Sequence, residues 1–221
     1  MRCRLVGSEM CIRDRITGAG TPGDTFPANN ASTISPDVHL QIVFDSPPTI
    51  NSGTVEIYDT ATNQLVDTIR SGLQQTTIGE RSLNAFLINT FENKLIINPN
   101  DGALAYGKTY AVVNNDGVIS GKVRGEDFRG VSRGSWQFST KQAAPSTANI
   151  TVDDDGAADF HSLQGAFNYM MSRYSGDANA QIMLKNGVYP ELLHLKGKNN
   201  LSIIGESRDH TIVRARNGNS I

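Results

Sequence analysis

The residues best suited to chemistry are aspartates in one polar stretch. Asp153, Asp154 and Asp155 are consecutive, and Asp159 follows shortly after them. Two carboxylates held close together could act as a general acid and a general base, one protonated and the other ionised. The stretch also lies directly before a segment with helical periodicity, where carboxylates stabilise a helix N-terminus through its dipole. We therefore predict a structural role for these aspartates rather than a catalytic one.

Glu191 and His194 are a second candidate, because a carboxylate beside an imidazole can transfer protons. The two residues are three positions apart in a segment that we predict to be a strand. Strand alternation would send them to opposite faces, so we predict that they do not form a dyad. The other histidines of this half of the chain, His161 and His210, are predicted to lie in turns.

Metal ligation is the next possibility. His39 stands between apolar residues of a predicted strand, and no second His, Cys or carboxylate lies at ligand spacing, which favours a half-exposed strand histidine. Asp116, Glu126 and Asp127 share one polar segment. They lack the regular spacing of oxygen ligands in a calcium loop, which favours a solvated loop. We predict no metal site and no cofactor.

Both cysteines, Cys3 and Cys11, lie in the opening stretch MRCRLVGSEMCIRDR. This stretch lacks the apolar core and the small-residue cleavage site of a secretory signal, and SEMCIRDR resembles a translated sequencing adapter. We interpret residues 1–15 as an artefact, with a disordered tail as the alternative, and leave them out of the fold. The natural start, with any signal peptide, would then be missing, and the cysteines would say nothing about redox compartment.

Length and composition limit what the protein can be. A chain of 221 residues suffices for two modest domains, and 19% charged residues, 38% hydrophobic residues and 21 glycines are typical of a turn-rich protein dominated by strands. The formal net charge of -2 offers no basic excess for phosphate, so we predict no nucleic-acid partner. Apolar stretches such as Ala85–Ile88 are far below the roughly 20 residues that cross a bilayer, so we predict no membrane span.

The first half of the chain reads as a series of short strands. Residues 16–26, rich in Gly, Pro and Thr, are predicted to be a linker. The predicted strands are Val38–Phe44, Gly53–Tyr58, Gln64–Thr68, Ala85–Asn89, Lys94–Asn98, Thr109–Val113 and Gly134–Ser139. About seven strands without an intervening helix indicate a β-sandwich. Trp136 and Phe138 would share one strand face, so we predict that Trp136 packs in the core rather than against a ligand.

The last part of the chain has a different pattern. Residues 142–148 contain small residues and no large apolar one, which predicts a domain boundary. Ser162 is placed to cap a helix that ends near residues 173–176, and its apolar stripe would contain Leu163, Ala166, Phe167, Met170 and Met171. The predicted strands are Asn149–Val152, Gln181–Leu184, Val188–Tyr189, Glu191–Leu195, Leu201–Ile204 and Thr211–Arg214. Short strands at such intervals indicate the first coils of a parallel β-helix.

Two resemblances can be stated on these residues. The run SPDVHLQIVFDSPPTINSGTVEIYDTATNQLVDTI, with LAYGKTYAVV and WQFST after it, resembles the bacterial Ig-like modules of surface and secreted proteins. It covers residues 27–141 and implies an Ig-like β-sandwich that serves as a spacer or interaction domain. Residues 149–221, with ITVDDDGAADFHSLQGAFNYM and IMLKNGVYPELLHLKGKNNLSIIGESRDHTIV, are similar to the opening of pectin methylesterases (pectinesterases). The matching positions are Gly156, Asp159, Phe160, Gln164, Ala166, Gly187, Tyr189, Glu191, Gly205 and Thr211.

The second resemblance implies a truncated, right-handed parallel β-helix with one N-terminal capping helix, after the Ig-like sandwich of a mainly β chain. In that family Tyr189 and Glu191 would serve coil geometry. Its members hydrolyse methyl esters of polygalacturonate with an aspartate nucleophile, an aspartate acid and base, a glutamine pair for the oxyanion and a positioning arginine, without metal. These residues lie in phrases resembling QAVAL, DFIFG and LGRPW, and none of the three phrases occurs in this sequence. No catalytic or substrate-binding residue can therefore be assigned.

We accordingly expect an inactive N-terminal fragment of an extracellular or cell-surface pectinesterase, monomeric, with pectin as the partner of the parent enzyme. Two alternatives stay open. A pectate lyase or other polysaccharide-active β-helix protein would carry a calcium-binding carboxylate cluster and a basic residue in the continuation of the chain. A non-enzymatic adhesion protein, with an Ig-like module on a β-helix stalk, would carry no catalytic phrase there.

Overall fold

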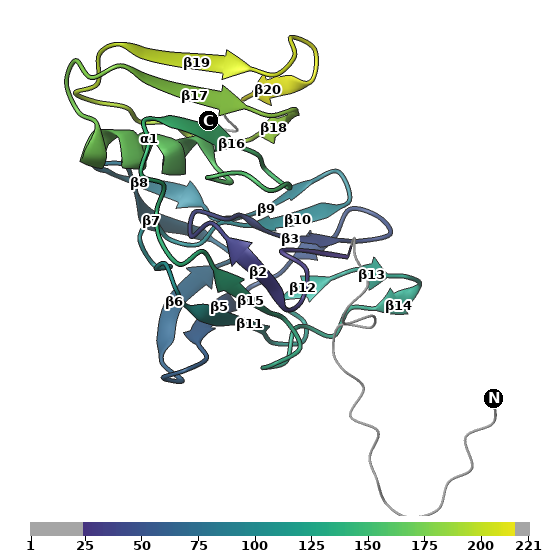
Figure 1. The fold of residues 1–221 in the computed structure, drawn as a ribbon. Helices are drawn as coiled ribbons and strands as arrows, with labels where there is room; N and C mark the ends of the chain where they lie inside the picture. The colour runs from purple at the N-terminus through teal and green to yellow at the C-terminus, as the bar shows by residue number, and fades with distance from the viewer. Residues whose placement is uncertain (1–23, 215–221) are drawn as a thin grey trace, which may run out of the picture.

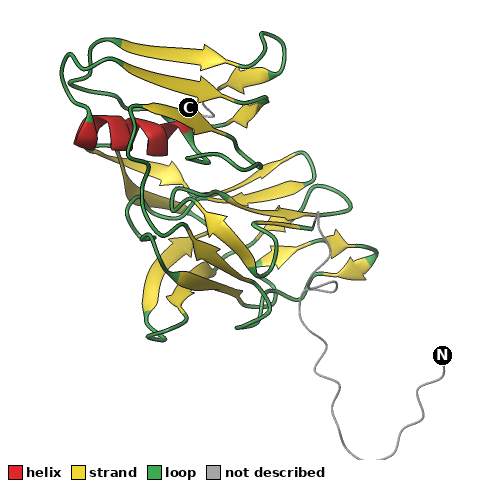
Figure 2. Ribbon diagram, in the orientation of Figure 1, coloured by secondary structure: helices red, strands yellow, loops and turns green. Residues whose placement is uncertain are grey.

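The computed structural model describes residues 24–214, which form a mainly β protein with one helix (Figures 1 and 2). The predicted mainly β class is confirmed. The predictions for residues 1–15, including Cys3 and Cys11, lie outside the described residues. No helix within residues 24–214 is long and apolar enough to span a membrane.

Two main sheets occupy the first region of the chain, residues 24–141. One is antiparallel with the order β1-β3-β10-β9. Its strands are β1 (Thr25–Phe26), β3 (Leu40–Val43), β9 (Ile88–Phe91) and β10 (Lys94–Ile97). The other has the order β2-β15-β11-β5-β6, with β2 and β15 parallel. Its strands are β2 (Ala31–Ile34), β5 (Thr54–Asp59), β6 (Leu65–Arg70), β11 (Thr109–Asn114) and β15 (Gln137–Thr140).

The buried side chains of both sheets form one core. In β5, Val55 and Ile57 are buried while Glu56 between them is half-exposed, the period of two that a strand with one covered face requires. Trp136 and Phe138 are both fully buried, and Trp136 Nε1 donates to the Pro27 carbonyl at 2.8 Å. The prediction that Trp136 is a core residue is confirmed.

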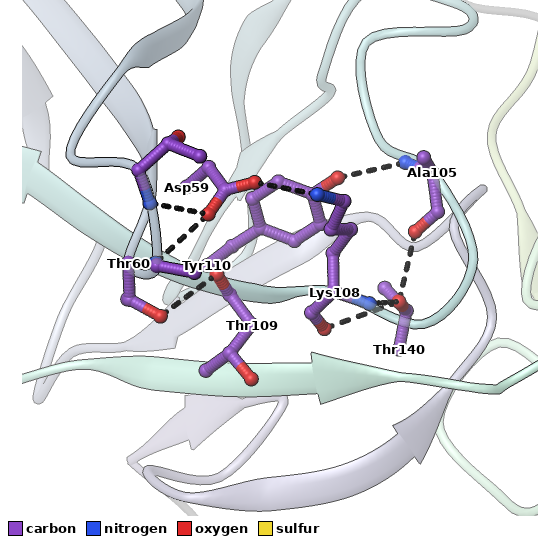
Figure 3. Close-up of polar contacts among 9 residues, drawn as sticks. Asp59, Thr60, Ala105, Lys108, Thr109, Tyr110 and Thr140 are labelled. Carbon is purple, nitrogen blue, oxygen red and sulfur yellow. Dashed lines mark hydrogen bonds and ion pairs between the residues drawn. The ribbon is translucent and has the colours of Figure 1, made fainter.

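A hydrogen-bonded corner lies beside the start of β11 (Figure 3). The Tyr110 hydroxyl accepts from the Ala105 N–H at 2.8 Å. Thr140 Oγ1 donates to the Ala105 carbonyl at 2.8 Å and accepts from the Lys108 N–H at 3.0 Å. Lys108 Nζ lies 3.2 Å from Asp59 Oδ2 on the neighbouring strand. The turn of LAYGKTY is thus fixed by side chains of three strands.

Smaller antiparallel pairs surround the main sheets. They are β4 (Thr49–Ile50) with β12 (Ile119–Ser120), β13 (Lys122–Val123) with β14 (Glu126–Asp127), and β7 (Leu73–Ile78) with β8 (Arg81–Phe86). The β7-β8 hairpin was not predicted from the sequence, which indicated a strand at Ala85–Asn89 instead. The strands β7 and β8 carry few apolar residues and are mostly exposed, so they lack the pattern of a half-buried strand.

The second region, residues 149–214, pairs its strands in parallel. The strands β16 (Asn149–Val152), β17 (Ala180–Leu184) and β19 (Leu201–Gly205) form one sheet in that order. The strands β18 (Gly187–Tyr189) and β20 (Thr211–Val213) form a parallel pair. In the larger sheet Ile182 lies between Ile150 and Ile203, so like side chains align across neighbouring strands.

The single helix of the described residues is α1 (Leu163–Arg173), with Ser162 as its N-cap. The Ser162 hydroxyl accepts from the Gly165 N–H at 2.9 Å, as predicted for a capping serine. The buried stripe differs from the prediction in one place, because Tyr169 is buried and Met171 is half-exposed. Tyr169 can be buried because its hydroxyl donates toward the carbonyls of Pro145 and Thr147, at 2.8 and 3.0 Å.

Several other boundaries were wrong. The predicted linker at residues 16–26 includes β1, which pairs with β3, and the strand Ala31–Ile34 was not predicted. His39 precedes β3 instead of lying inside it. Glu191–Leu195 is not a strand. In this segment the Gln164 side chain forms hydrogen bonds with the backbone of His194. Its oxygen accepts from the His194 N–H at 2.6 Å, and its Nε2 donates to the His194 carbonyl at 3.0 Å.

The second region has a core of its own, separate from that of the sheets. It joins the inner faces of β16 and β17 to α1, with Val152, Ile182 and Met170 all fully buried. Phe138 is the last buried member of the first core in chain order, and Ile150 is the first of the second. Ala144 packs partly buried against the second core. The domain boundary at residues 142–148 stays a prediction.

Candidate functional site

A candidate site is a cleft between the two regions, with a volume of about 1410 Å³. The first region contributes the β7-β8 hairpin, the loop before β3 and the loop after β10. The second region contributes α1 and the segment that follows β18. Figure 1 shows α1 next to β7 and β8. Distant parts of the sequence therefore build this cleft together.

Asp37 fixes the first region to the start of α1. Its Oδ2 accepts from the His161 N–H at 3.0 Å and from the Ser162 N–H and hydroxyl, each at 2.7 Å. Gly165 lies so close that a Cβ there would meet Asp37 Oδ2 at 2.3 Å. Glycine at this position of the helix therefore allows the carboxylate to approach.

Glu191 covers the next N–H groups of the same helix. Its Oε1 accepts from the Leu163 N–H at 2.9 Å and its Oε2 from the Gln164 N–H at 2.8 Å. The residue is only 7% exposed. Burial raises the pKa of Glu191 to about 7, the two N–H donors oppose the rise, and the charge of Asp37 adds to it. Both oxygens accept backbone N–H groups, so this carboxylate stabilises the N-terminus of α1.

The acidic stretch lies in the turn before α1, as predicted, but it does not supply the carboxylates that are hydrogen-bonded at the helix start. The first turn of α1 holds no acidic residue, and Asp37 and Glu191 occupy the N-terminal position expected for Asp153, Asp154 and Asp155. The reason is that capping groups can come from distant segments, which local periodicity does not reveal. Their assignment to that helix dipole was therefore wrong.

Asp153, Asp154 and Asp155 form the one group within residues 24–214 that could hold a metal ion, with ligand oxygens within 4.8 Å of one another. Burial, followed by the charges of Asp155 and Asp153, raises the pKa of Asp154 to about 6, against a hydrogen bond from the Val188 N–H. Asp159 differs, because its Oδ2 accepts from the Thr151 N–H at 2.8 Å. Asp159 therefore has a structural role, as a hydrogen-bond acceptor for β16.

The histidines of the second region occupy separate places. No hydrogen bond joins the side chains of Glu191 and His194 within the described residues, because Glu191 is engaged with α1. His161 is buried, its ring meets Phe26 edge-on at 5.2 Å, and its Nδ1 lies 2.9 Å from the Asp153 carbonyl. His210 is exposed in the turn before β20, as predicted.

The remaining candidates do not converge on a site. His39 lines the cleft, and burial lowers its pKa despite the opposing charges of Asp37 and Asp154. Asp116 and Asp127 lie 3.8 and 3.7 Å from Arg129, on the exposed surface, and Glu126 is exposed beside them in β14.

Further contacts across the boundary hold the cleft in shape. Asn168 Nδ2 donates to Asp101 Oδ2 at 2.8 Å, and Lys196 Nζ lies 3.0 Å from Glu80 Oε2. Lys141 Nζ donates to the carbonyls of Ala158 and Asp159. These contacts between the two regions were not predicted. Among the residues that join the regions, only Asp159 and Glu191 had a sequence signal, as positions of the resemblance to pectin methylesterases.

No known protein-family model matches the chain, and no curated protein matches it. The best-placed carboxylates of the cleft, Asp37 and Glu191, are engaged with the start of α1. Neither has a free oxygen paired with a second acid, a base or a nucleophile. The cleft is arranged for binding more than for proton transfer.

Proposed function

We propose that this chain is the N-terminal part of a secreted pectin methylesterase, in which an Ig-like β-sandwich precedes the first coils of a right-handed parallel β-helix. The parent enzyme would convert methyl-esterified polygalacturonate to pectate and methanol. It would act as a monomer outside the cell or at its surface. The observation that carries the proposal is the parallel pairing of consecutive strands within the segment that resembles the pectin methylesterase opening.

That pairing is what stacked coils require. In a β-helix each coil repeats the previous one and buries its apolar side chains against the next. The alignment of Ile150, Ile182 and Ile203 across three strands agrees with this arrangement, as does the second parallel pair, β18 with β20. The buried face of α1 packs on this core. In the proposed β-helix, α1 would cover the N-terminal end of the stack.

The outer edge of the stack supports further coils. Within residues 24–214 the strand β19 pairs with β17 alone, and Ile203, Ile204, Ile212 and Val213 are between 42% and 47% exposed. Large apolar side chains are costly to leave in water. In the proposed enzyme the next coil would cover them.

The Ig-like assignment of the first region has its own support. The Tyr110 hydroxyl bonds to the backbone five residues upstream at Ala105, and Tyr110 lies near the start of β11. A tyrosine bonded back to the backbone in this way is a recurring feature of Ig-like sandwiches. The two sheets with a shared core agree with the same architecture.

The chain itself would not catalyse ester hydrolysis. The family places its two aspartates, its glutamines and its arginine in later phrases that this sequence does not contain. Glu191 cannot substitute, since both of its oxygens accept backbone N–H groups. We therefore expect methanol release from the parent enzyme and none from the 221-residue chain.

The test is to recover the reading frame beyond Ile221, express the extended protein and measure methanol released from methyl-esterified pectin. We expect the extension to contain phrases like DFIFG and LGRPW, and replacing the aspartate of the first phrase with asparagine should abolish release. The 221-residue chain is the matched control. Methanol release by that control, or an extension without these phrases, would refute the proposal. A calcium-dependent lyase activity or a long non-catalytic stalk would then identify the alternatives.

A further inference from the structure

We propose that the cleft between the two regions is a binding site for an uncharged, hydroxyl-rich chain. The choice of ligand rests on the proposed function, which makes the ligand a methyl-esterified segment of polygalacturonate. Four properties of the cleft lead to this inference: its size, its charge, its hydrogen-bonding groups and its apolar rim.

The size of the cleft suits an extended ligand. Its volume of about 1410 Å³ exceeds the roughly 300–1,000 Å³ of sites for drug-sized molecules. Both walls are fixed by contacts across the boundary, such as that of Asp37 with Ser162 and that of Asn168 with Asp101. A preformed cleft of this kind binds a chain without the cost of first ordering its walls.

The charges near the helix start are compensated inside the protein. Asp37 and Glu191 face the N-terminal N–H groups of α1, where the helix dipole offsets negative charge. Burial raises the pKa of Glu191 to about 7, so this group is partly protonated near neutral pH. Burial lowers the pKa of His39, so its ring stays neutral there. This end of the cleft therefore offers no cation to an anionic ligand.

The other carboxylates of the cleft are Glu80 and Asp101. Glu80 has the exposed Lys196 at 3.0 Å, and Asp101 accepts at 2.8 Å from Asn168, whose amide carries no charge. Arg173, in the last turn of α1, is the basic side chain among the lining residues. A cleft that offers an anion one arginine beside several carboxylates repels a polyanion. De-esterified polygalacturonate should therefore bind poorly, and the neutral, esterified form should bind better.

Hydrogen bonding in the cleft falls mainly to carboxamides. The lining includes Asn84, Asn89, Asn98, Asn100, Asn168 and Gln164. A carboxamide offers two donors and one acceptor oxygen, which suits hydroxyl groups that donate and accept at once. Asn98 uses one N–H on the Leu87 carbonyl at 3.2 Å, and Asn84 forms no side-chain hydrogen bond within residues 24–214. Gln164, Asn100 and Asn168 are engaged within the protein, so the amide of Asn84 and the remaining N–H of Asn98 are among the groups left for a ligand.

An apolar platform stands beside these amides. Leu73 and Phe86 pair directly across the β7-β8 hairpin, so their side chains lie on one face, and Asn84 lies two residues along on that face. Leu73 is 58% exposed and Phe86 47% exposed. An exposed aromatic ring next to an amide can cover the apolar face of a sugar ring while the amide binds its hydroxyls.

The test is a calorimetric titration of the 221-residue chain with short oligogalacturonates of one length, one fully methyl-esterified and the other unesterified. We expect the esterified oligomer to bind at least about ten-fold more tightly than the unesterified one. Equal affinities, or tighter binding of the unesterified oligomer, would refute the preference of the cleft for an uncharged ligand. Absence of binding by both oligomers would refute the site altogether.

Two variants locate the binding. Phe86→Ala should weaken the esterified complex by about ten-fold, and Asn84→Ala should weaken it by less. Leu65→Ala is the matched control, because Leu65 is a similarly exposed apolar residue of β6 that does not line the cleft. If Phe86→Ala binds like the unchanged chain, or Leu65→Ala weakens binding equally, the cleft is not the site. Methanol release by the extended protein is measured separately, so failure here leaves the enzyme assignment standing, and the reverse also holds.

Discussion

The two regions of this chain cover their apolar surfaces in different ways. In the first region two sheets face each other, and side chains such as Ile57 and Leu95 are fully buried between them. In the second region β16 and β17 are covered by α1, while the outer edge at β19 and β20 leaves four large apolar residues exposed. In the proposed architecture a sandwich would complete its own core, whereas stacked coils would complete theirs only by adding the next coil.

The largest expected effect tests the closed core. Trp136→Ala should lower the free energy of unfolding of the first region by about 3–5 kcal/mol, because it leaves a cavity and an unpaired Pro27 carbonyl. Urea denaturation followed by circular dichroism measures the loss. Leu65→Ala, at an exposed position, is the control and should cost less than about 0.5 kcal/mol. Equal losses in both variants would mean that the sheets share no tight core.

The next effect concerns the buried carboxylate of the second region. The pKa of Glu191 is raised from 4.5 to about 7, so its protonated form stabilises the folded state. That stability is complete below pH 4.5 and is lost as the pH rises through about 7, a fall of about 3 kcal/mol from this group. Glu191→Gln should flatten the fall, measured by urea denaturation across this range.

Asp154→Asn is the control for Glu191, since burial also raises the pKa of Asp154, to about 6. It should remove a separate part of the pH dependence and leave that of Glu191. A variant Glu191→Gln whose stability follows the pH as the unchanged chain does would show that the carboxylate is not buried as described.

A smaller effect tests the contact that joins the two regions. In most helices Gly→Ala stabilises by up to about 1 kcal/mol. Gly165→Ala should instead destabilise, by about 1–2 kcal/mol, because its Cβ would lie 2.3 Å from Asp37 Oδ2, which three hydrogen bonds hold in place. The measurement is thermal unfolding of Gly165→Ala, Asp37→Ala and the double variant.

The sign of the Gly165→Ala effect should reverse in the Asp37→Ala background, where the space is free and only the helix preference remains. Such coupling is what a double-mutant cycle detects between residues in contact. Additive effects would mean that Asp37 and Gly165 do not meet, and that the first region is not fixed to α1 through this carboxylate.

The comparison also shows what sequence patterns can and cannot reveal. The hairpin of β5 and β6, the capped helix and the strand Asn149–Val152 were predictable, because each is specified by neighbouring residues. The β7-β8 hairpin was not, since its strands are polar and exposed and pair mainly with each other. The capping of α1 by Asp37 joins residues 125 positions apart, as the Ser162 hydrogen bond shows, and no local pattern encodes it.

The smallest effect on stability belongs to the open edge, and it separates the two regions most sharply. Ile203→Thr and Ile212→Thr replace exposed side chains of β19 and β20, so each should change the free energy of unfolding by less than about 0.5 kcal/mol. The same changes should reduce concentration-dependent self-association, measured by sedimentation velocity, since an exposed apolar edge strand is a template for pairing. Ile57→Thr, in the closed core, is the contrast and should cost several times more. A loss of similar size at Ile203 would show that this edge is already covered, and the proposed next coil would have no surface to complete.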